Sequence, residues 1–236
     1  MNKLIAEGKT KQIFTTENEN VVKIHYTNHT TALNGKREED IDEKGSLNNR
    51  ISSLIFTYLA KNGVNTCFLE KLSENEQLDK KLTMIPLEVV VRNFASGSFQ
   101  RKFNTEYLAP LANPVQEFFM KSDELDDPFI NNDQIKALNI VDDNQIKTMH
   151  AMALKINDLL SDLFDKANIM LVDFKVEFGV DSDGNIVLGD EISPDSCRLV
   201  DKSTKKSLDK DVFRKNLGNL VDGYKTVLAR LEAEAK

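Results

Sequence analysis

The feature that most constrains this chain is the alternation of apolar and charged residues over Val172–Phe178. Valine and phenylalanine occupy every second position, and Asp173, Lys175 and Glu177 stand between them. A period of two residues is typical of a β-strand with one buried face. Because the apolar side is aromatic and β-branched, we expect this strand to lie in the core of a sheet, with its charged side lining a cleft.

A tight turn follows this strand. The residues of Asp181–Gly184 tolerate left-handed backbone, so a hairpin is expected. If the loop is those four residues, Val180 pairs with Asn185, and Lys175 faces Asp190 on the returning strand. Asp190 then joins the charged side of the first strand. A loop one residue longer or shorter would put Asp190 on the other face, so this prediction depends on the register.

Three carboxylates and a lysine on one sheet face allow two interpretations. The simpler one is a solvated outer face. The other is a ligand site, favoured by the core position of the strand and by the polar segment Ser193–Arg198 that follows the hairpin. Carboxylates without a nearby histidine suit a hard, oxygen-binding cation such as Mg²⁺ that bridges to phosphates.

Composition and charge exclude several classes of protein. The 236 residues suffice for one large domain or two small ones. We expect no membrane partner, because no apolar run approaches the roughly 18 residues of a membrane span and the first residues lack a signal-peptide pattern. The formal net charge of −7 argues against a nucleic-acid partner. Cys67 and Cys197 stand far apart and are expected as reduced thiols of a cytoplasmic protein.

The remaining helices and strands are predicted from hydrophobic periodicity and from the capping residues and glycines that bound each segment. A helix is expected from an N-cap at Ser46 to Gly63, another over Asp142–Ala167 with a capping box, and a last one from Asp209. Strands are expected at residues 4–7, 11–15, 21–26, 66–69, 82–84, 87–93 and 113–119. The polar residues 34–45 are expected to form a loop.

Pro86 should interrupt the strand ladder, which predicts a boundary between two lobes. Residues 1–85 would form an N-terminal, β-rich lobe. Residues 86–236 would form a C-terminal α+β lobe. The fold class expected is therefore α+β, with two lobes and a cleft between them.

Two segments have the composition of anion sites. Gly8 forms a turn flanked by Lys9 and Lys11, which either covers phosphates or is only a turn. Further along, Arg92 precedes a run of small residues that ends at Ser98 and leads into a helix start. Backbone N–H groups, a hydroxyl and fixed positive charge bind anions well, although a simple loop with a capping serine is the alternative.

Eight segments in order carry a more specific signal. They are EGKTK (7–11), NGK (34–36), KGSLNN (44–49), IPLEVVVRNFASGS (85–98), DELDDPFIN (123–131), LVDFKVEFG (171–179), GDEISPDSCRL (189–199) and LDKDVFR (208–214). Together they closely resemble the SAICAR synthetase family of purine biosynthesis over essentially the whole chain. The resemblance implies a two-lobed, ATP-grasp-like fold with ATP held between the lobes.

The resemblance also implies an activity. Family members join L-aspartate to the carboxylate of carboxyaminoimidazole ribonucleotide (CAIR), giving SAICAR, ADP and phosphate, and they require Mg²⁺. Asp173 and Lys175 would be the catalytic residues beside the reacting carboxylate. An acyl phosphate is the expected intermediate, because a free carboxylate is a poor electrophile. A homodimer is what the bacterial family suggests, and a small-molecule phosphotransferase with the same nucleotide cleft is the alternative function.

Binding roles follow from the resemblance as well. ATP phosphates would contact Gly8, Lys9 and Lys11, and adenine would meet the backbone of an interlobe hinge that runs from Met84 to Leu87.

Two further ligands are implied for the second lobe. Mg²⁺ would be held by Glu177 and Asp190. The phosphate of CAIR would be bound by Arg92, Ser98 and Arg198.

Overall fold

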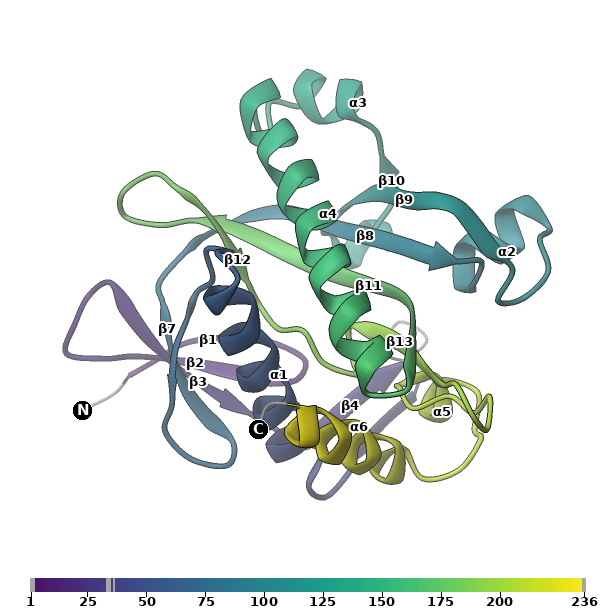
Figure 1. The fold of residues 1–236 in the computed structure, drawn as a ribbon. Helices are drawn as coiled ribbons and strands as arrows, with labels where there is room; N and C mark the ends of the chain where they lie inside the picture. Colours follow the sequence, from purple (N-terminus) through teal and green to yellow (C-terminus); the bar gives the residue numbers. More distant parts are fainter. Residues whose placement is uncertain (1–2, 33–34, 36, 235–236) are drawn as a thin grey trace.

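The computed structural model describes residues 3–32, 35 and 37–234. Its strands are β1 (Leu4–Glu7), β2 (Lys11–Thr15), β3 (Val21–Tyr26), β4 (His29–Ala32), β5 (Arg37–Asp40), β6 (Phe68–Lys71), β7 (Glu76–Lys80), β8 (Thr83–Phe94), β9 (Pro110–Met120), β10 (Phe129–Ile130), β11 (Ile169–Val180), β12 (Ile186–Gly189) and β13 (Cys197–Asp201). The helices are α1 (Lys44–Lys61), α2 (Gly97–Phe103), the 3-10 turn η1 (Asp123–Leu125), α3 (Asn132–Ala137), α4 (Asp143–Lys166), α5 (Asp211–Arg214) and α6 (Leu220–Glu234) (Figure 1).

The first sheet is antiparallel and contains five strands in the order β1-β2-β3-β7-β6. Alternate residues of β3 are buried, so Val22, Ile24 and Tyr26 form a small apolar cluster with Ile13 of β2. The three strands predicted at 4–7, 11–15 and 21–26 are confirmed. The strand predicted at 66–69 is shifted to β6, and β7 was not predicted.

The second sheet contains the main site strand. Its order is β10-β9-β8-β11-β12, and β13 pairs with the other half of β11. One edge of β11 is bonded to β8, while the opposite edge is bonded to β13 and then to β12. Helix α4 lies across this sheet and packs Met149, Ile156 and Leu160 into the core (Figure 1). Its predicted start is confirmed: Asp142 caps the helix and forms a capping box with Gln145.

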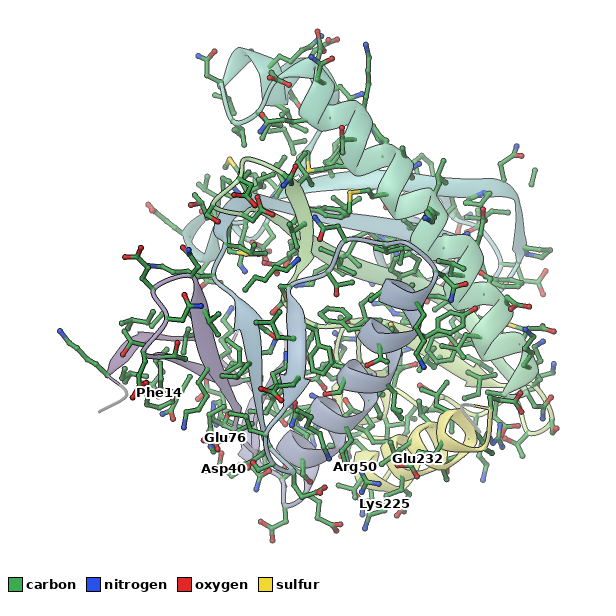
Figure 2. All side chains as sticks on the ribbon, turned by 60° about the vertical axis from the view of Figure 1, so that its left-hand side comes forward. Phe14, Asp40, Arg50, Glu76, Lys225 and Glu232 are labelled. Atoms are coloured by element: carbon green, nitrogen blue, oxygen red, sulfur yellow. The ribbon has the colours of Figure 1, made fainter. Side chains whose placement is uncertain are left out.

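Helices α1 and α6 pack side by side and join the same core. Ile51, Ile55 and Leu59 of α1 are fully buried there. At the surface, Arg50 of α1 donates to Glu232 of α6 at 2.6 Å (Figure 2). Among the described residues no helix is long and apolar enough to span a bilayer.

The predicted register of the β11–β12 hairpin is wrong by one residue. Val180 pairs with Ile186, so the loop has five residues instead of four, and Glu177 lies opposite Gly189. Had β12 continued, Asp190 would have pointed to the other face. The strand instead ends at Gly189, and Asp190 adopts a left-handed backbone with φ 58°, which returns its carboxylate to the charged face.

The predicted strand break at Pro86 is also wrong. Strand β8 runs continuously from Thr83 to Phe94. Proline is tolerated because the ladder with β11 has a bulge at this point, between the pairs Glu177–Glu88 and Gly179–Met84. The Pro86 carbonyl accepts a hydrogen bond from the Lys121 N–H at 3.0 Å. The two large sheets nevertheless divide between β7 and β8.

Three other expectations need correction. Helix α1 starts at Lys44, so Ser46 is inside the helix instead of capping it. The polar residues 34–45 include strand β5, which pairs with β4, although Asn34 and Lys36 lie outside the described residues. The predicted last helix is split into α5 and α6, because Gly218 has φ 137° and the chain leaves the helix.

Candidate active site

Strand β11 places three predicted site residues on one side of the second sheet. Asp173 and Glu177 are only 3% and 2% exposed, and Lys175 is partly buried. The solvated outer face considered above is therefore wrong. Buried carboxylates at this density need positive partners, and the partners come from both sheets.

Two cavities lie against these side chains. One, of about 400 Å³, is lined by Arg92, Ser98 and Arg198, and we call it the arginine cavity. The other, of about 390 Å³, is lined by Lys11 and Asp190, and we call it the lysine cavity. They adjoin, because their linings have residues in common: Lys9, Glu88, Lys175, Asp195, Ser196 and Lys210.

A third cavity adjoins the lysine cavity on the side away from the arginine cavity. It has a volume of about 340 Å³, and its aliphatic lining comes from the first sheet and from the residues around the start of β8, including Ile24, Leu82 and Met84. We call it the apolar cavity. Its lining shares four charged residues with the lysine cavity, namely Lys11, Lys121, Glu177 and Asp190.

Asp173 lies between two arginines in the arginine cavity. Arg92 Nη1 donates to Asp173 Oδ2 at 2.8 Å, and Arg198 Nη1 donates to both Asp173 oxygens at 3.0 and 3.1 Å. Arg92 also donates to Glu117 at 2.6 Å and to the Ser98 hydroxyl at 3.0 Å. The structure thus brings the predicted anion-binding residues Arg92, Ser98 and Arg198 together around one carboxylate.

The guanidinium of Arg198 is closely packed and strongly held in its charged form. A Cβ on Gly97, whose φ is +56°, would lie 2.8 Å from Arg198 Nη2. Burial lowers the pKa of Arg198, but the charges of Asp173 and Asp211 outweigh burial and raise the pKa above its usual value. Arg198 is therefore a fixed cation.

Lys175 is surrounded by carboxylates in the lysine cavity. Its Nζ lies 2.5 Å from Glu177 Oε1, 3.1 Å from Glu88 Oε1 and 3.6 Å from Asp190 Oδ2. Burial disfavours its charge, but the acids, Asp190 first, raise the pKa of Lys175 well above its usual range. Lys175 is therefore a cation rather than a base in this arrangement.

Lys11 reaches the same cavity from the first sheet. Its Nζ lies 2.6 Å from Asp190 Oδ1 and 3.2 Å from Glu191 Oε1. Burial works against the charge of Asp190, yet Lys11 and then Lys175 lower the pKa of Asp190 below its usual range. Asp190 thus contacts one lysine from each lobe, Lys11 and Lys175.

The glycine turn between β1 and β2 forms one wall of the lysine cavity. Gly8 and Lys9 both line it, and the Gly8 N–H donates to the Lys11 carbonyl at 2.8 Å. Lys9 also lines the arginine cavity and reaches across to Asp123 at 2.6 Å.

The predicted hinge residues have different surroundings. Met84 lines the apolar cavity and is 41% exposed. Leu87 is 1% exposed, and its side chain belongs to the core of the second lobe. The side chain of Met84 is therefore available to a ligand, whereas Leu87 offers its backbone alone.

The row of cavities runs from apolar, through lysine-rich and acidic, to arginine-rich. That sequence of environments fits a nucleotide base, then its phosphates, then a second anionic substrate. A family model described as SAICAR synthetase matches residues 4–231. The chain belongs to the SAICAR synthetase family.

Curated relatives match this chain in sequence over nearly its full length. Phosphoribosylaminoimidazole-succinocarboxamide synthase of Pediococcus pentosaceus is 57% identical over 228 residues, which cover 97% of this chain and 94% of that protein. The protein of the same name from Listeria innocua is 51% identical over 231 residues, 98% of each chain.

Solved structures give the same result. The crystal structure of phosphoribosylaminoimidazole-succinocarboxamide synthase from Ehrlichia chaffeensis superposes with a TM-score of 0.96 at 44% identity, covering 98% of this chain and 99% of that one. A SAICAR synthetase in complex with ADP has a TM-score of 0.93 at 40% identity and 96% coverage of both chains. The predicted family, the two-lobed α+β fold and the ligase activity are confirmed, in preference to the phosphotransferase alternative.

The acids of this SAICAR synthetase family member suit a metal that is shared with phosphates. Among the described residues no group of three or more His, Cys, Asp or Glu side chains could hold a metal ion by itself. Mg²⁺ bound with a nucleotide usually takes only one or two protein carboxylates and completes its shell with phosphate and water oxygens. Glu177 and Asp190 fit that chemistry, because each lines the lysine cavity and pairs with a lysine there.

Sequence reasoning gave no role to a buried cluster beside the two polar cavities. Lys44 Nζ lies 2.6 Å from Asp195 Oδ2, and Tyr224 donates its hydroxyl to the other oxygen of Asp195. Lys210 Nζ lies 3.8 Å from Asp195, and burial, with the nearby charge of Lys44, lowers the pKa of Lys210. For Lys44, Asp195 and Lys210 the available signal was their position within the family segments at 44–49, 189–199 and 208–214, whereas Tyr224 lies outside these segments.

Glu88 and Lys121 were missed as well. Glu88 lies opposite Glu177 in the β8–β11 ladder and contacts Lys175, while Lys121 Nζ lies 2.6 Å from Glu177 Oε2. A lone glutamate inside the apolar run of β8 was a usable signal for Glu88. Lys121 follows the end of β9, where a charged residue carries no such signal.

Proposed function

We propose that the row of cavities holds the two large substrates of SAICAR synthesis end to end. Adenine occupies the apolar cavity beside Met84 and the backbone up to Leu87, and the ATP phosphates lie in the lysine cavity against Gly8, Lys9 and Lys11. The observation that carries this proposal is the shared lining of the three cavities, which makes one continuous path. The ADP complex of a relative with the same fold supports nucleotide binding.

The arginine cavity takes CAIR. Arg92, Ser98 and Arg198 bind its phosphate, because two fixed guanidinium groups and a hydroxyl match a phosphate dianion. Asp173 holds both arginines in place. We therefore assign Asp173 to positioning these arginines within the reaction site.

Glu177 and Asp190 would hold Mg²⁺ together with ATP, and the ion would supply neutralisation of phosphate charge. In this structure lysines contact the same carboxylates, at 2.5 Å for Lys175 on Glu177 and 2.6 Å for Lys11 on Asp190. With the ion in place, these lysines would be released to contact the phosphates, and the site would stay close to electrically balanced.

The chemistry has two steps. A CAIR carboxylate oxygen attacks the γ-phosphorus of ATP, the bond to the bridging oxygen breaks, and ADP leaves with that electron pair. The amine of L-aspartate then attacks the carbonyl carbon of the acyl phosphate, and inorganic phosphate leaves as the amide forms and the amine loses a proton. Lys175, a cation at the junction of the two polar cavities, stabilises the charge on the transferred phosphoryl group.

The two lobes have separate tasks in this proposal. Residues 1–85 cover the nucleotide, and residues 86–236 carry the metal and CAIR sites. We also propose that the protein is a cytoplasmic homodimer that binds neither nucleic acid nor membrane. Sedimentation equilibrium should give twice the 26.7 kDa of the chain.

The deciding experiment measures phosphate release from ATP while Mg²⁺, CAIR and L-aspartate are omitted in turn. Release should require all three, and SAICAR should accumulate in equal amount. With ¹⁸O in the CAIR carboxylate, one labelled oxygen should appear in the released phosphate. Release without L-aspartate would instead support a phosphotransferase, and unlabelled phosphate would exclude the acyl phosphate.

A further inference from the structure

One buried carboxylate in the apolar cavity has no part in the chemistry above. Asp79 of β7 lines this cavity and is 5% exposed. On β7 alternate residues are buried, so Gln77 and Asp79 point to the same side of the first sheet. The walls around Asp79 include the aliphatic side chains of Val22, Ile24 and Leu82, and the cavity is also lined by charged residues, among them Lys11, Lys80 and Lys81.

The surroundings of Asp79 leave it short of positive partners. Gln77 Nε2 donates to both of its oxygens, at 2.8 and 3.0 Å, and Cys67 contributes a weak side-chain hydrogen bond. Within the described part of the chain, no lysine, arginine or histidine lies within ion-pair distance of Asp79. Burial raises the pKa of Asp79 to about 6, although the Gln77 hydrogen bonds and the more distant charge of Lys11 partly offset the effect.

A structural role explains this arrangement poorly. An apolar residue at position 79 would fill the same wall without the free-energy cost of burying a carboxylate that has no cationic partner. A direct part in the phosphoryl transfer is not expected of Asp79, because it lines the apolar cavity and neither of the two polar cavities. A ligand atom that donates a hydrogen bond would complete its surroundings.

We propose that Asp79 selects the base of the nucleotide by accepting a hydrogen bond from the exocyclic amine of adenine. The inference rests on the proposed function, since it takes the apolar cavity as the base site. A purine with an amine at C6 offers a donor to the carboxylate. A 6-oxopurine offers an acceptor, which leaves the carboxylate unpaired and repelled, so guanine and hypoxanthine nucleotides bind less well.

The test compares ATP with inosine triphosphate (ITP), which differs at C6 by the exchange of amine for oxygen. KM and kcat are measured for both nucleotides in the three-substrate phosphate-release assay. The wild-type protein should favour ATP by at least about tenfold in kcat/KM, the usual size of one charged hydrogen bond. Asp79→Asn, whose amide can donate to an oxo group, should reduce the ATP:ITP ratio at least about tenfold through KM, with kcat for ATP little changed.

Two further variants complete the experiment. Asp79→Leu removes hydrogen bonding altogether and should also reduce the ratio at least about tenfold, while Asp158→Asn on the exposed side of α4 should leave it unchanged. Equal KM values for ATP and ITP in the wild type, or an unchanged ratio in Asp79→Asn, would overturn the proposal. An equal fall in kcat/KM for ATP and for ITP in the Asp79 variants would overturn it too, because Asp79 would then only maintain the shape of the cavity.

A binding measurement separates this inference from the proposed function. Calorimetric titration with ADP and with inosine diphosphate needs no turnover. In one outcome, phosphate release is independent of CAIR and L-aspartate while ADP still binds better than inosine diphosphate in the wild type and not in Asp79→Asn. That result would support the base selectivity of Asp79 and contradict the ligase assignment of the cavities. If turnover requires all substrates while both diphosphates bind equally, the ligase stands and the role of Asp79 falls.

Discussion

Lys44 and Asp195 form an ion pair that is closed off from solvent. Lys44 Nζ lies 2.6 Å from Asp195 Oδ2, and the two side chains are 0% and 7% exposed. Lys44 also donates to the His29 carbonyl at 3.0 Å. The pair therefore connects the first turn of α1 and the start of β4 to the loop that follows β12, and Asp195 lines both polar cavities.

Lys44→Met should destabilise the protein strongly. Removing one member of a buried ion pair leaves the other charge uncompensated, which typically costs about 3–5 kcal/mol. The free energy of unfolding from urea titration measures the effect, and Lys44→Met with Asp195→Leu should recover part of it. The control is Lys225→Met, since Lys225 pairs with Glu43 at 2.7 Å on the surface and should change stability by about 0.5 kcal/mol or less. An equal loss of unfolding free energy in Lys44→Met and Lys225→Met would show that the buried pair contributes no more to stability than the surface pair.

Asp190→Asn should abolish most turnover while the fold persists. Its carboxylate holds Lys11 and lies close to Lys175, and it is a proposed Mg²⁺ ligand. Loss of one such electrostatic group typically lowers kcat by about 10²–10³. Phosphate release at saturating Mg²⁺ gives the change, and Asp183→Asn in the exposed hairpin turn serves as the matched control. Near-normal kcat in Asp190→Asn would remove this residue from the site.

Gly97→Ala should weaken CAIR binding more than ATP binding. The new Cβ would lie 2.8 Å from Arg198 Nη2, so the guanidinium must shift. Gly184→Ala carries a similar backbone cost, because its φ is +83°, but nothing lies within 4 Å of the added Cβ. Both variants should lose about 1 kcal/mol of stability, while only Gly97→Ala should raise KM for CAIR, by at least about tenfold. Equal KM values would mean that Arg198 does not contact CAIR.

The stability difference between wild type and Asp209→Asn should depend on pH. Burial, and then the charge of Asp211, raise the pKa of Asp209 from 3.8 to about 6. Because the folded state holds this proton more tightly, the contribution is fully present below pH 3.8 and is lost as pH rises through about 6, roughly 3 kcal/mol in all. Urea titrations from pH 4 to pH 7 should show the wild type losing stability relative to the variant.

The sign of that effect has an internal control. Asp181 has a lowered pKa, first because the Asn185 N–H donates to it, so its contribution is present at high pH and is lost as pH falls. The wild type should therefore gain stability relative to Asp181→Asn only as pH rises toward about 4, and the difference should stay constant from about pH 4 to pH 7. The same slope in both comparisons would contradict the assignment for Asp209.

The alternation around Asp173, Lys175 and Glu177 was enough to predict the central strand, because the period of a β-strand is visible in the residues themselves. The hairpin register was not predictable. Loops of four and five residues fit Asp181–Asn185 equally well, and the face of Asp190 was decided by a left-handed backbone that the residue type does not reveal. Pro86 was misread because a bulge in the partner ladder removed the need for its N–H.

Long-range contacts were the part that residue patterns could not supply. The predicted cations Arg92 and Arg198 were recognised, but their shared partner Asp173 was assigned elsewhere, because sequence spacing says nothing about which carboxylate lies between them. Lys44, Lys210 and Tyr224 come from three separate helices or their flanks and meet only at Asp195. Such a cluster becomes visible once the packing of α1 and α6 against the second sheet is known.

Strand β11 is hydrogen-bonded to β8 on one edge and to β12 and β13 on the other. This position limits which insertions and deletions the strand can accept. Four residue steps, about 13 Å along a strand, separate Asp173 in the arginine cavity from Glu177 in the lysine cavity. Hydrogen bonds on both edges fix that length, and losing one residue between them would send every later charge to the opposite face. In the proposed function, the distance between the two reacting substrates is therefore set by a length of strand, whereas the apolar cavity, which is bounded partly by the other sheet, is less constrained.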